Sequence, residues 1–174
     1  MTKGINLEGY IRSIPNWPKK GILFRDITPL LAEPKAFSAA VDALCADFTG
    51  EGIEYVAAVE ARGFIFGAAV ARKLEAGFVP IRKKGKLPFK TESISYDLEY
   101  GTDTLEVHSD AIAKGAKVLM VDDLLATGGT MAAACQLIEK IEGQVVGIAF
   151  LIELQELSGR EKLKQYKISA IITY

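Results

Sequence analysis

The amino-acid sequence predicts an α/β fold in which a mostly parallel, twisted sheet is flanked by helices. Short apolar runs at Tyr55–Val59 and at residues 118–121 and 145–152 have the length and composition of buried strands. Segments with hydrophobic residues at helical spacing lie between them. Continuous apolar strands that are separated by helices are typical of a parallel sheet covered on both faces.

The elements follow one another in a regular order. The first predicted helix covers residues 37–48 and ends at Gly50 and Gly52, because glycine commonly stops a helix. A strand at Tyr55–Val59 and a helix of small residues at 64–74 come next. The remaining predicted elements are strands at 78–81 and 118–121, a helix at 130–142, and strands at 145–152 and 168–172.

Residues 82–101 interrupt this order. They are polar and basic, and they contain Gly85 and Pro88. A long stretch without regular structure inside a compact domain is usually functional or mobile. The sequence therefore predicts an irregular loop here.

Length and charge exclude several classes of protein. The chain has 174 residues and a formal net charge of −1, so we expect one domain and no generic binder of nucleic acid or membrane surfaces. No apolar run approaches the ~18 residues of a membrane span, and the N-terminal residues have no apolar core of a signal peptide. Cys45 and Cys135 fit no metal or disulfide spacing, so we expect reduced structural thiols in a cytoplasmic protein.

The most informative segment is residues 118–130. A buried strand delivers Asp122 and Asp123 to its carboxyl end, and a turn of small residues then opens a helix. The first N–H groups of a helix have no partner within the helix, and its dipole favours an anion there. The residues expected to form this phosphate cradle are Ala126, Thr127, Gly128, Gly129 and Thr130.

Two common phosphate motifs are absent, since the segment contains neither Gly-Lys-Ser/Thr nor GxGxxG. Paired carboxylates would repel a phosphate unless they faced something else, and a sugar diol is a natural partner. A ribose 5-phosphate satisfies both halves of the segment. The alternative is an ordinary capped helix with acidic residues in its first turn.

Three further groups of residues are ambiguous when taken alone. Arg62 follows a predicted strand and has the planar fork that suits phosphate, but it could equally pair with a surface carboxylate. The basic cluster that begins at Arg82 would usually be a solvated face. Phe24 and Arg25 are predicted to lie in a turn, where the aromatic ring could stack on a flat base or pack in the core.

The segment at 118–130 resembles the phosphoribosyl pyrophosphate motif of the type I phosphoribosyltransferases. The similarity extends over nearly the whole chain, and the segments at 21–27, 61–64, 82–88 and 98–101 resemble the adenine-using branch of that family. The resemblance implies a single domain over residues 1–174, with an N-terminal base-binding hood at 1–34 and a flexible loop at 82–103.

The resemblance also implies a role for individual residues. Asp122, Asp123 and residues 126–130 would bind the phosphoribose, and Glu60, Ala61, Arg62, Arg82 and Lys86 would bind the pyrophosphate. The base would lie against Leu23, Phe24 and Arg25, with Glu99 and Arg62 as catalytic residues and Tyr100 supporting the loop. The family's pyrophosphate loop often contains a non-proline cis peptide, which is expected at Glu60–Ala61.

The activity implied by the resemblance is transfer of a 5-phosphoribosyl group from phosphoribosyl pyrophosphate to adenine, which forms AMP and pyrophosphate. Mg²⁺ would arrive with the substrate, near Asp122 and Asp123 but with no protein ligand assigned. A homodimer is expected. Two alternatives stay open: a phosphoribosyltransferase for hypoxanthine, guanine, xanthine or orotate, and a phosphoribosyl-sensing regulator that binds nucleic acid.

Overall fold

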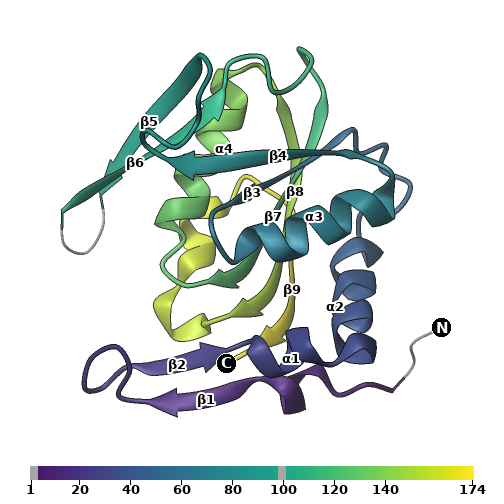
Figure 1. The fold of residues 1–174 in the computed structure, drawn as a ribbon, viewed down its shortest axis with the longest axis vertical. Coiled ribbons are helices and arrows are strands. Elements are labelled where there is room, and N and C mark those ends of the chain that lie inside the picture. The colour runs from purple at the N-terminus through teal and green to yellow at the C-terminus, as the bar shows by residue number, and fades with distance from the viewer. Residues whose placement is uncertain (1–3, 98–100) are drawn as a thin grey trace.

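The computed structural model describes residues 4–97 and 101–174, and it confirms the α/β fold (Figure 1). In this part of the chain the main sheet has seven strands in the order β5-β6-β4-β3-β7-β8-β9. The neighbours β4, β3, β7, β8 and β9 are parallel, whereas β6 pairs antiparallel with both β4 and β5. The parallel strands are β3 (Tyr55–Val59), β4 (Gly77–Lys83), β7 (Lys117–Leu125), β8 (Gln144–Glu153) and β9 (Ile168–Thr173).

Helices cover both faces of this sheet, as the apolar strands predict. On one face, α2 (Pro34–Ala46) and α3 (Gly63–Leu74) pack against alternate strand residues such as Val56 and Leu119. On the other face, α4 (Gly129–Lys140) packs against the strand residues that alternate with these, such as Ala57 and Met120. Successive side chains of a strand point to opposite faces, so continuous apolar strands supply both cores.

The strand order reverses next to β3. The chain passes from β3 through α3 to β4 on one side, and later returns as β7 on the other side of β3. In an open α/β sheet, this reversal leaves a crevice beyond the carboxyl ends of the two strands, where ligands bind. The loops after β3 and β7 therefore meet at this crevice.

The prediction of an irregular stretch at 82–101 was right for residues 84–90, which form no helix or strand, and wrong for Thr91–Asp97. Residues on either side of the undescribed segment form an antiparallel pair, β5 (Thr91–Asp97) and β6 (Thr102–His108). Partly buried and exposed residues alternate along much of β5, which is typical of an edge strand with one solvated face. The polar residues Ser93, Ser95 and Asp97 lie on that solvated face, whereas the basic residues Lys84, Lys86 and Lys90 lie in the irregular segment before the strand. The movement expected of residues 82–103 stays a hypothesis.

The predicted turn at Phe24 and Arg25 was also wrong. Both residues lie in β2 (Leu23–Asp26), which pairs antiparallel with β1 (Arg12–Pro15) in a separate two-stranded sheet. The turn precedes them and begins at Asn16, whose side-chain oxygen accepts a hydrogen bond of 2.9 Å from the Gly21 N–H. With η1 (Leu7–Tyr10) and α1 (Thr28–Ala32), this small sheet makes up the described part of the segment expected to be the hood.

The two cysteines are buried and unpaired, as predicted. Burial raises the pKa of Cys45 to about 11 and that of Cys135 to about 12, so both thiols stay protonated at neutral pH. Two short helical turns, η2 (Gln155–Leu157) and η3 (Gly159–Leu163), connect β8 to β9. None of the described helices has the length and apolar character that crossing a bilayer requires.

Candidate active site

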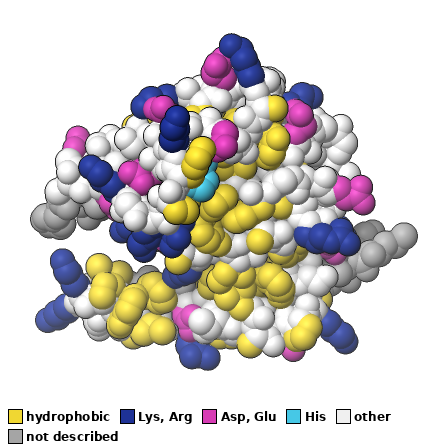
Figure 2. Space-filling view, turned by 45° about the horizontal axis from the view of Figure 1, so that its top comes forward, with side chains coloured by type: hydrophobic (Ala, Val, Ile, Leu, Met, Phe, Trp, Pro, Cys, Tyr) yellow, Lys and Arg dark blue, Asp and Glu magenta, His cyan; other side chains and the backbone are white. Residues whose placement is uncertain are grey.

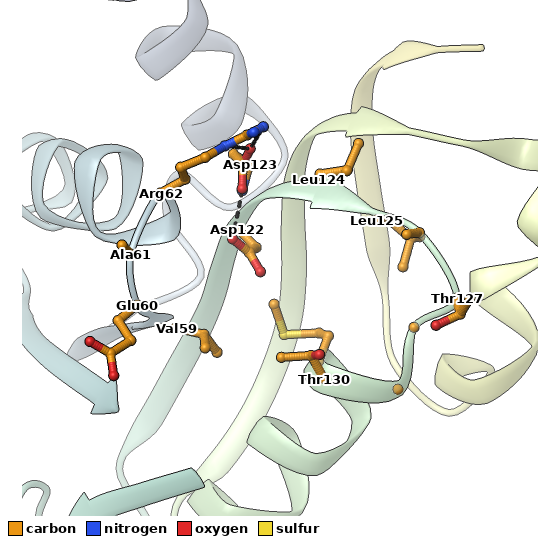
Figure 3. A pocket seen from close by; sticks show the side chains of 14 residues that line it. Val59, Glu60, Ala61, Arg62, Asp122, Asp123, Leu124, Leu125, Thr127 and Thr130 are labelled. Atoms are coloured by element: carbon orange, nitrogen blue, oxygen red, sulfur yellow. Dashed lines mark hydrogen bonds and ion pairs between the residues drawn. The ribbon is translucent and has the colours of Figure 1, made fainter. Parts of the chain in front are cut away.

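A cavity of about 420 Å³ lies beyond the carboxyl ends of β3 and β7 (Figure 3). The loop after β3 supplies Glu60, Ala61 and Arg62 to its wall, and the end of β7 supplies Asp122 and Asp123. The predicted phosphate cradle completes the lining with Ala126, Thr127, Gly128, Gly129 and Thr130. The structure thus brings together two loops that are about sixty residues apart in the chain.

The cradle ends in an open helix N-terminus. Gly128 precedes α4 in the left-handed region, with a φ of 76°, and no side chain caps the helix. The first turn of α4 also contains no acidic residue. The alternative of a capped helix with acidic first-turn residues is therefore wrong, and the free N–H groups of this turn face the cavity as donors for an anion.

The cradle is held in place by a residue that the sequence did not single out. A β-carbon on Gly128 would overlap the carbonyl oxygen of Gly159, and a β-carbon on Gly159 would overlap the carbonyl oxygen of Ala126. Two glycines thus allow the backbone of η3 to lie directly against the cradle. Only the fold reveals this contact, because Gly159 stands in a polar stretch outside every motif.

The two carboxylates at the end of β7 have different environments. Asp123 Oδ2 accepts hydrogen bonds from Arg62, including one of 2.6 Å from Nε, whereas Asp122 points toward the middle of the cavity (Figure 3). Asp122 Oδ1 accepts a bond of 2.9 Å from the Asp123 N–H. Burial, and next the charge of Asp123, raise the pKa of Asp122 well above its ordinary value.

The loop after β3 approaches Asp122 closely. A β-carbon on Gly63, the first residue of α3, would lie 2.7 Å from Asp122 Oδ1, so a larger residue there would displace the Asp122 carboxylate. The peptide bond between Glu60 and Ala61 is cis, as expected from the resemblance.

Arg62 connects the cavity to the small N-terminal sheet. Its guanidinium binds the Asp123 carboxylate, lies 3.5 Å from the carbonyl oxygen of Arg25 through Nη2, and stands 5.1 Å from the ring centre of Phe24. Arg62 is one-third exposed, while Asp123 is nearly buried. The sequence left open whether Arg62 binds a ligand or pairs with a carboxylate. Here it pairs with a carboxylate of the site itself, at the cavity wall.

Glu60, on the same loop as Arg62, holds part of the basic cluster by hydrogen bonds. Its Oε2 accepts a hydrogen bond of 2.9 Å from Arg82 Nη2 and one of 3.3 Å from Lys86 Nζ, and Oε1 accepts one of 2.7 Å from the Lys83 N–H. Burial alone would raise the pKa of Glu60, but these bonds outweigh it and lower the pKa. Arg82 and Lys86 are therefore held beside the cavity and not dispersed on a solvated face.

The residues expected at the base lie in β2. Leu23 is about half exposed, and the Phe24 ring packs edge-on against Trp17 at 4.4 Å between centroids. The guanidinium carbon of Arg25 lies 3.4 Å from the ring centre of Tyr174, the last residue of the chain. The sequence did not indicate this contact, because its two residues are far apart in the chain.

Two predicted site residues, Glu99 and Tyr100, lie outside the described residues. Within residues 4–97 and 101–174, no group of three or more His, Cys, Asp or Glu side chains is arranged to hold a metal ion. Asp122 and Asp123 nevertheless offer carboxylate oxygens at the cavity. This donor set fits Mg²⁺, which usually keeps several waters and binds substrate phosphates with few protein ligands.

The fold and the cavity agree with a known family. Residues 31–172 match the family described as "Phosphoribosyl transferase domain". This match covers most of the chain, which therefore belongs to the phosphoribosyltransferases.

Individual relatives narrow the family further. The chain is 55% identical over 170 residues to an adenine phosphoribosyltransferase of Brachyspira hyodysenteriae, covering 98% of this chain and 100% of the relative. It superposes with a TM-score of 0.94 on the adenine phosphoribosyltransferase of Thermoanaerobacter pseudethanolicus, at 51% identity over 97% of this chain and 98% of the other. Its TM-score is 0.90 with the Saccharomyces cerevisiae enzyme, solved with an imino-altritol bisphosphate and adenine, at 40% identity and coverage of 95% and 96%. Within the family, the chain belongs with the adenine phosphoribosyltransferases.

Proposed function

We propose that the protein transfers the 5-phosphoribosyl group of phosphoribosyl pyrophosphate to adenine, forming AMP and pyrophosphate. The observation that carries this proposal is the single cavity in which an uncapped helix N-terminus, a carboxylate pair and an arginine meet. Anion donors, diol acceptors and a phosphate-binding cation are the groups that a phosphorylated ribose with a pyrophosphate leaving group requires.

The 5-phosphate binds the N–H groups that open α4 and the hydroxyls of Thr127 and Thr130. Thr130 Oγ1 lies 3.3 Å from the hydroxyl of Tyr96, so it can exchange that partner for a phosphate oxygen. Asp122 accepts hydrogen bonds from the ribose hydroxyls, since it points into the cavity. Asp123 reaches the ribose when the ligand displaces part of its contact with Arg62.

The pyrophosphate lies between Arg62, Arg82 and Lys86. Glu60 balances part of the positive charge of Arg82 and Lys86 in the free protein and keeps both side chains near the cavity. As the bond at the anomeric carbon breaks, negative charge grows on the pyrophosphate, and these fixed cations stabilise it. Mg²⁺ bound to the substrate near Asp122 and Asp123 would supply further charge neutralisation.

The base binds along β2, through the backbone of Leu23 and Arg25 and the face of Phe24. A strand at the edge of a two-stranded sheet has N–H and C=O groups that can pair with a ligand. The contact of Arg62 with the Arg25 carbonyl indicates that this edge borders the cavity. The solved complex of the yeast relative with adenine supports adenine as the base.

Glu99 would assist the base chemically, by accepting a proton from the purine or stabilising its charge. Closure of residues 82–103 would bring Glu99 and Tyr100 to the substrate and exclude water, which competes as a nucleophile at the activated sugar carbon.

The enzyme would act as a cytoplasmic homodimer. Figure 2 shows hydrophobic side chains gathered over the middle of one face, and Ile65 and Phe89 are among the large apolar residues that are exposed. Exposed apolar patches commonly mark contacts between proteins. The unpaired, buried cysteines suit a reducing compartment.

The decisive experiment measures pyrophosphate release from phosphoribosyl pyrophosphate and Mg²⁺ with adenine, hypoxanthine, guanine, xanthine and orotate in separate reactions. We expect rapid release with adenine alone. A preference for another base would refute the assignment of the base. Absence of release with every base, together with tight binding of RNA or DNA, would favour the regulator instead.

A matched variant tests the ribose contacts. Replacing Asp122 and Asp123 together by Asn keeps their size but removes both charges, and we expect kcat/KM to fall by about a hundredfold or more because two charge-assisted hydrogen bonds are weakened. Near-normal kinetics with the folded double variant would refute the assignment.

A further inference from the structure

The segment that connects β8 to β9 lies beside the phosphate cradle. In Figure 1 this segment is yellow and lies near the start of α4. The backbone of Gly159 contacts the cradle at Ala126 and Gly128, where side chains at either glycine would overlap it. The η3 turn is therefore part of the wall that supports the cradle.

Two further contacts fix η3 in position. Arg160 donates hydrogen bonds of 2.7 Å from both Nε and Nη2 to the Glu153 carboxylate at the end of β8, which is almost fully buried. Leu163 is completely buried in the core under α4. Gly159 and Leu163 thus hold the two ends of η3, and the hydrogen bonds of Arg160 to Glu153 hold the residue next to Gly159. These contacts give Lys162, which precedes Leu163, a defined place.

Lys162 has its ammonium group at the start of α4. Its Nζ is 3.7 Å from the position that a β-carbon on Gly129 would occupy. Gly129 is the first residue of α4 and lines the cavity. The positive charge therefore stands next to the N–H groups that are open to an anion.

The positive charge of Lys162 is also not neutralised by an ion pair with any described carboxylate. Arg62, Arg82 and Lys86 each pair with a carboxylate of the site. By contrast, no carboxylate of residues 4–97 or 101–174 forms an ion pair with Lys162. An unpaired ammonium beside an uncapped helix N-terminus adds full charge to the partial charge of the helix dipole.

From these contacts we infer that Lys162 is a binding residue for the 5-phosphate, which places the η3 turn in the substrate site. The inference rests on the proposed function, since it assigns a partner to the phosphate of that substrate. Arg160 and Glu153 act through Lys162 and are positioning residues. Because Lys162 borders the cradle and not the wall formed by Glu60, Arg82 and Lys86, its contribution is specific to the 5-phosphate.

The test compares three variants by calorimetric titration with ribose 5-phosphate and, separately, with pyrophosphate and Mg²⁺. Lys162→Met keeps the length without the charge, Lys162→Arg keeps the charge, and Lys164→Met removes a neighbouring exposed lysine that pairs with Glu161. We expect Lys162→Met to raise the Kd of ribose 5-phosphate about tenfold, at the lower end for a charge-assisted hydrogen bond at an exposed site. Lys162→Arg should recover most of the affinity.

Several measurements distinguish a loss of phosphate binding by Lys162→Met from a general loss of stability. The Tm of ligand-free Lys162→Met and its Kd for pyrophosphate should match those of the parent protein, and the salt dependence of ribose 5-phosphate binding should weaken. An unchanged Kd for ribose 5-phosphate, or an equal loss in Lys164→Met, would overturn the inference, as would failure of the parent protein to bind ribose 5-phosphate. If the parent binds ribose 5-phosphate but releases no pyrophosphate from phosphoribosyl pyrophosphate in the presence of adenine and Mg²⁺, the proposed function fails while the comparison of variants still decides the role of Lys162.

Discussion

Replacing Gly128 by Ala tests whether the phosphate cradle depends on direct contact with η3. Two separate costs arise. The φ of Gly128 is 76°, a conformation that costs a residue with a β-carbon about 1–2 kcal/mol. The new methyl group would also overlap the Gly159 carbonyl oxygen and lie 3.1 Å from its carbon and 3.3 Å from its α-carbon.

The overlap has no inexpensive relief, because the obstructing atoms belong to the backbone of a turn fixed by Arg160 and Leu163. Overpacking of this kind typically costs about 1–3 kcal/mol in addition to the conformational cost. If η3 moves away to relieve the overlap, the cradle loses its support. We therefore expect both stability and affinity for ribose 5-phosphate to fall.

Gly115→Ala is the matched control. Gly115 has a φ of 75°, and a β-carbon there would meet nothing within 4 Å. The two variants share the conformational cost and differ only in the overlap. In thermal unfolding, Gly128→Ala should have a Tm about 2–12 °C below that of Gly115→Ala, because each kcal/mol shifts Tm by about 2–4 °C in a chain of this size.

Calorimetric titration should also show weaker ribose 5-phosphate binding for Gly128→Ala alone. Equal Tm values and equal Kd values for the two variants would refute the reasoning, because they would mean that η3 yields without consequence.

Three further predictions concern other walls of the cavity. Because the pKa of Asp122 is raised, its ionisation opposes folding at every pH above the unfolded-state value of about 3.9; Asp122→Asn should therefore raise Tm at pH 7 and leave it nearly unchanged near pH 3. Tyr174→Ala removes the ring under Arg25, so the KM for adenine should rise about threefold, the equivalent of a partly exposed cation–π contact, with little change for phosphoribosyl pyrophosphate. Arg62→Lys keeps the charge but loses the fork that binds Asp123, and steady-state kinetics should show kcat/KM reduced by about tenfold or more.

Each of these predictions has a contrasting outcome. A pH-independent effect of Asp122→Asn on Tm would mean that its charge is not the source of the cost. Tyr174→Phe serves as the control for the ring, because it keeps the aromatic face and should leave the adenine KM unchanged. Full activity of Arg62→Lys would show that a point charge is sufficient and that the geometry of the guanidinium is irrelevant.

The sequence alone determined the central sheet, its helices and the nature of the phosphate cradle. The strand Tyr55–Val59 was predicted with its correct bounds. A parallel strand that is buried on both faces has a continuous apolar run, and here charged residues, Glu54 and Glu60, stand at both ends of that run. The cradle and the carboxylate pair before it were recognisable because the carboxylates, hydroxyls and glycines are adjacent in the chain. Such patterns involve residues that are neighbours in the chain, so they can be read directly from the sequence.

Edge elements were harder to predict. Leu23–Asp26 and Thr91–Asp97 form strands, although their sequences suggested a turn and a loop. Both strands lie outside the parallel part of the sheet, and each obtains its partner from another segment. Propensity is weak in such strands because pairing and burial, and not the strand's own composition, stabilise them.

Only the tertiary structure decided how the charged residues of the site pair. Arg62 and Asp123 are 61 positions apart, and Glu60 and Arg82 are 22 apart, yet each pair meets at one cavity wall. The positions of Gly159, Lys162 and Tyr174 beside the cavity also depend on the return of the chain through β8 and β9. Long-range contacts of this kind arise from packing of the whole sheet, and no local pattern in the sequence encodes which partners the folded chain brings together.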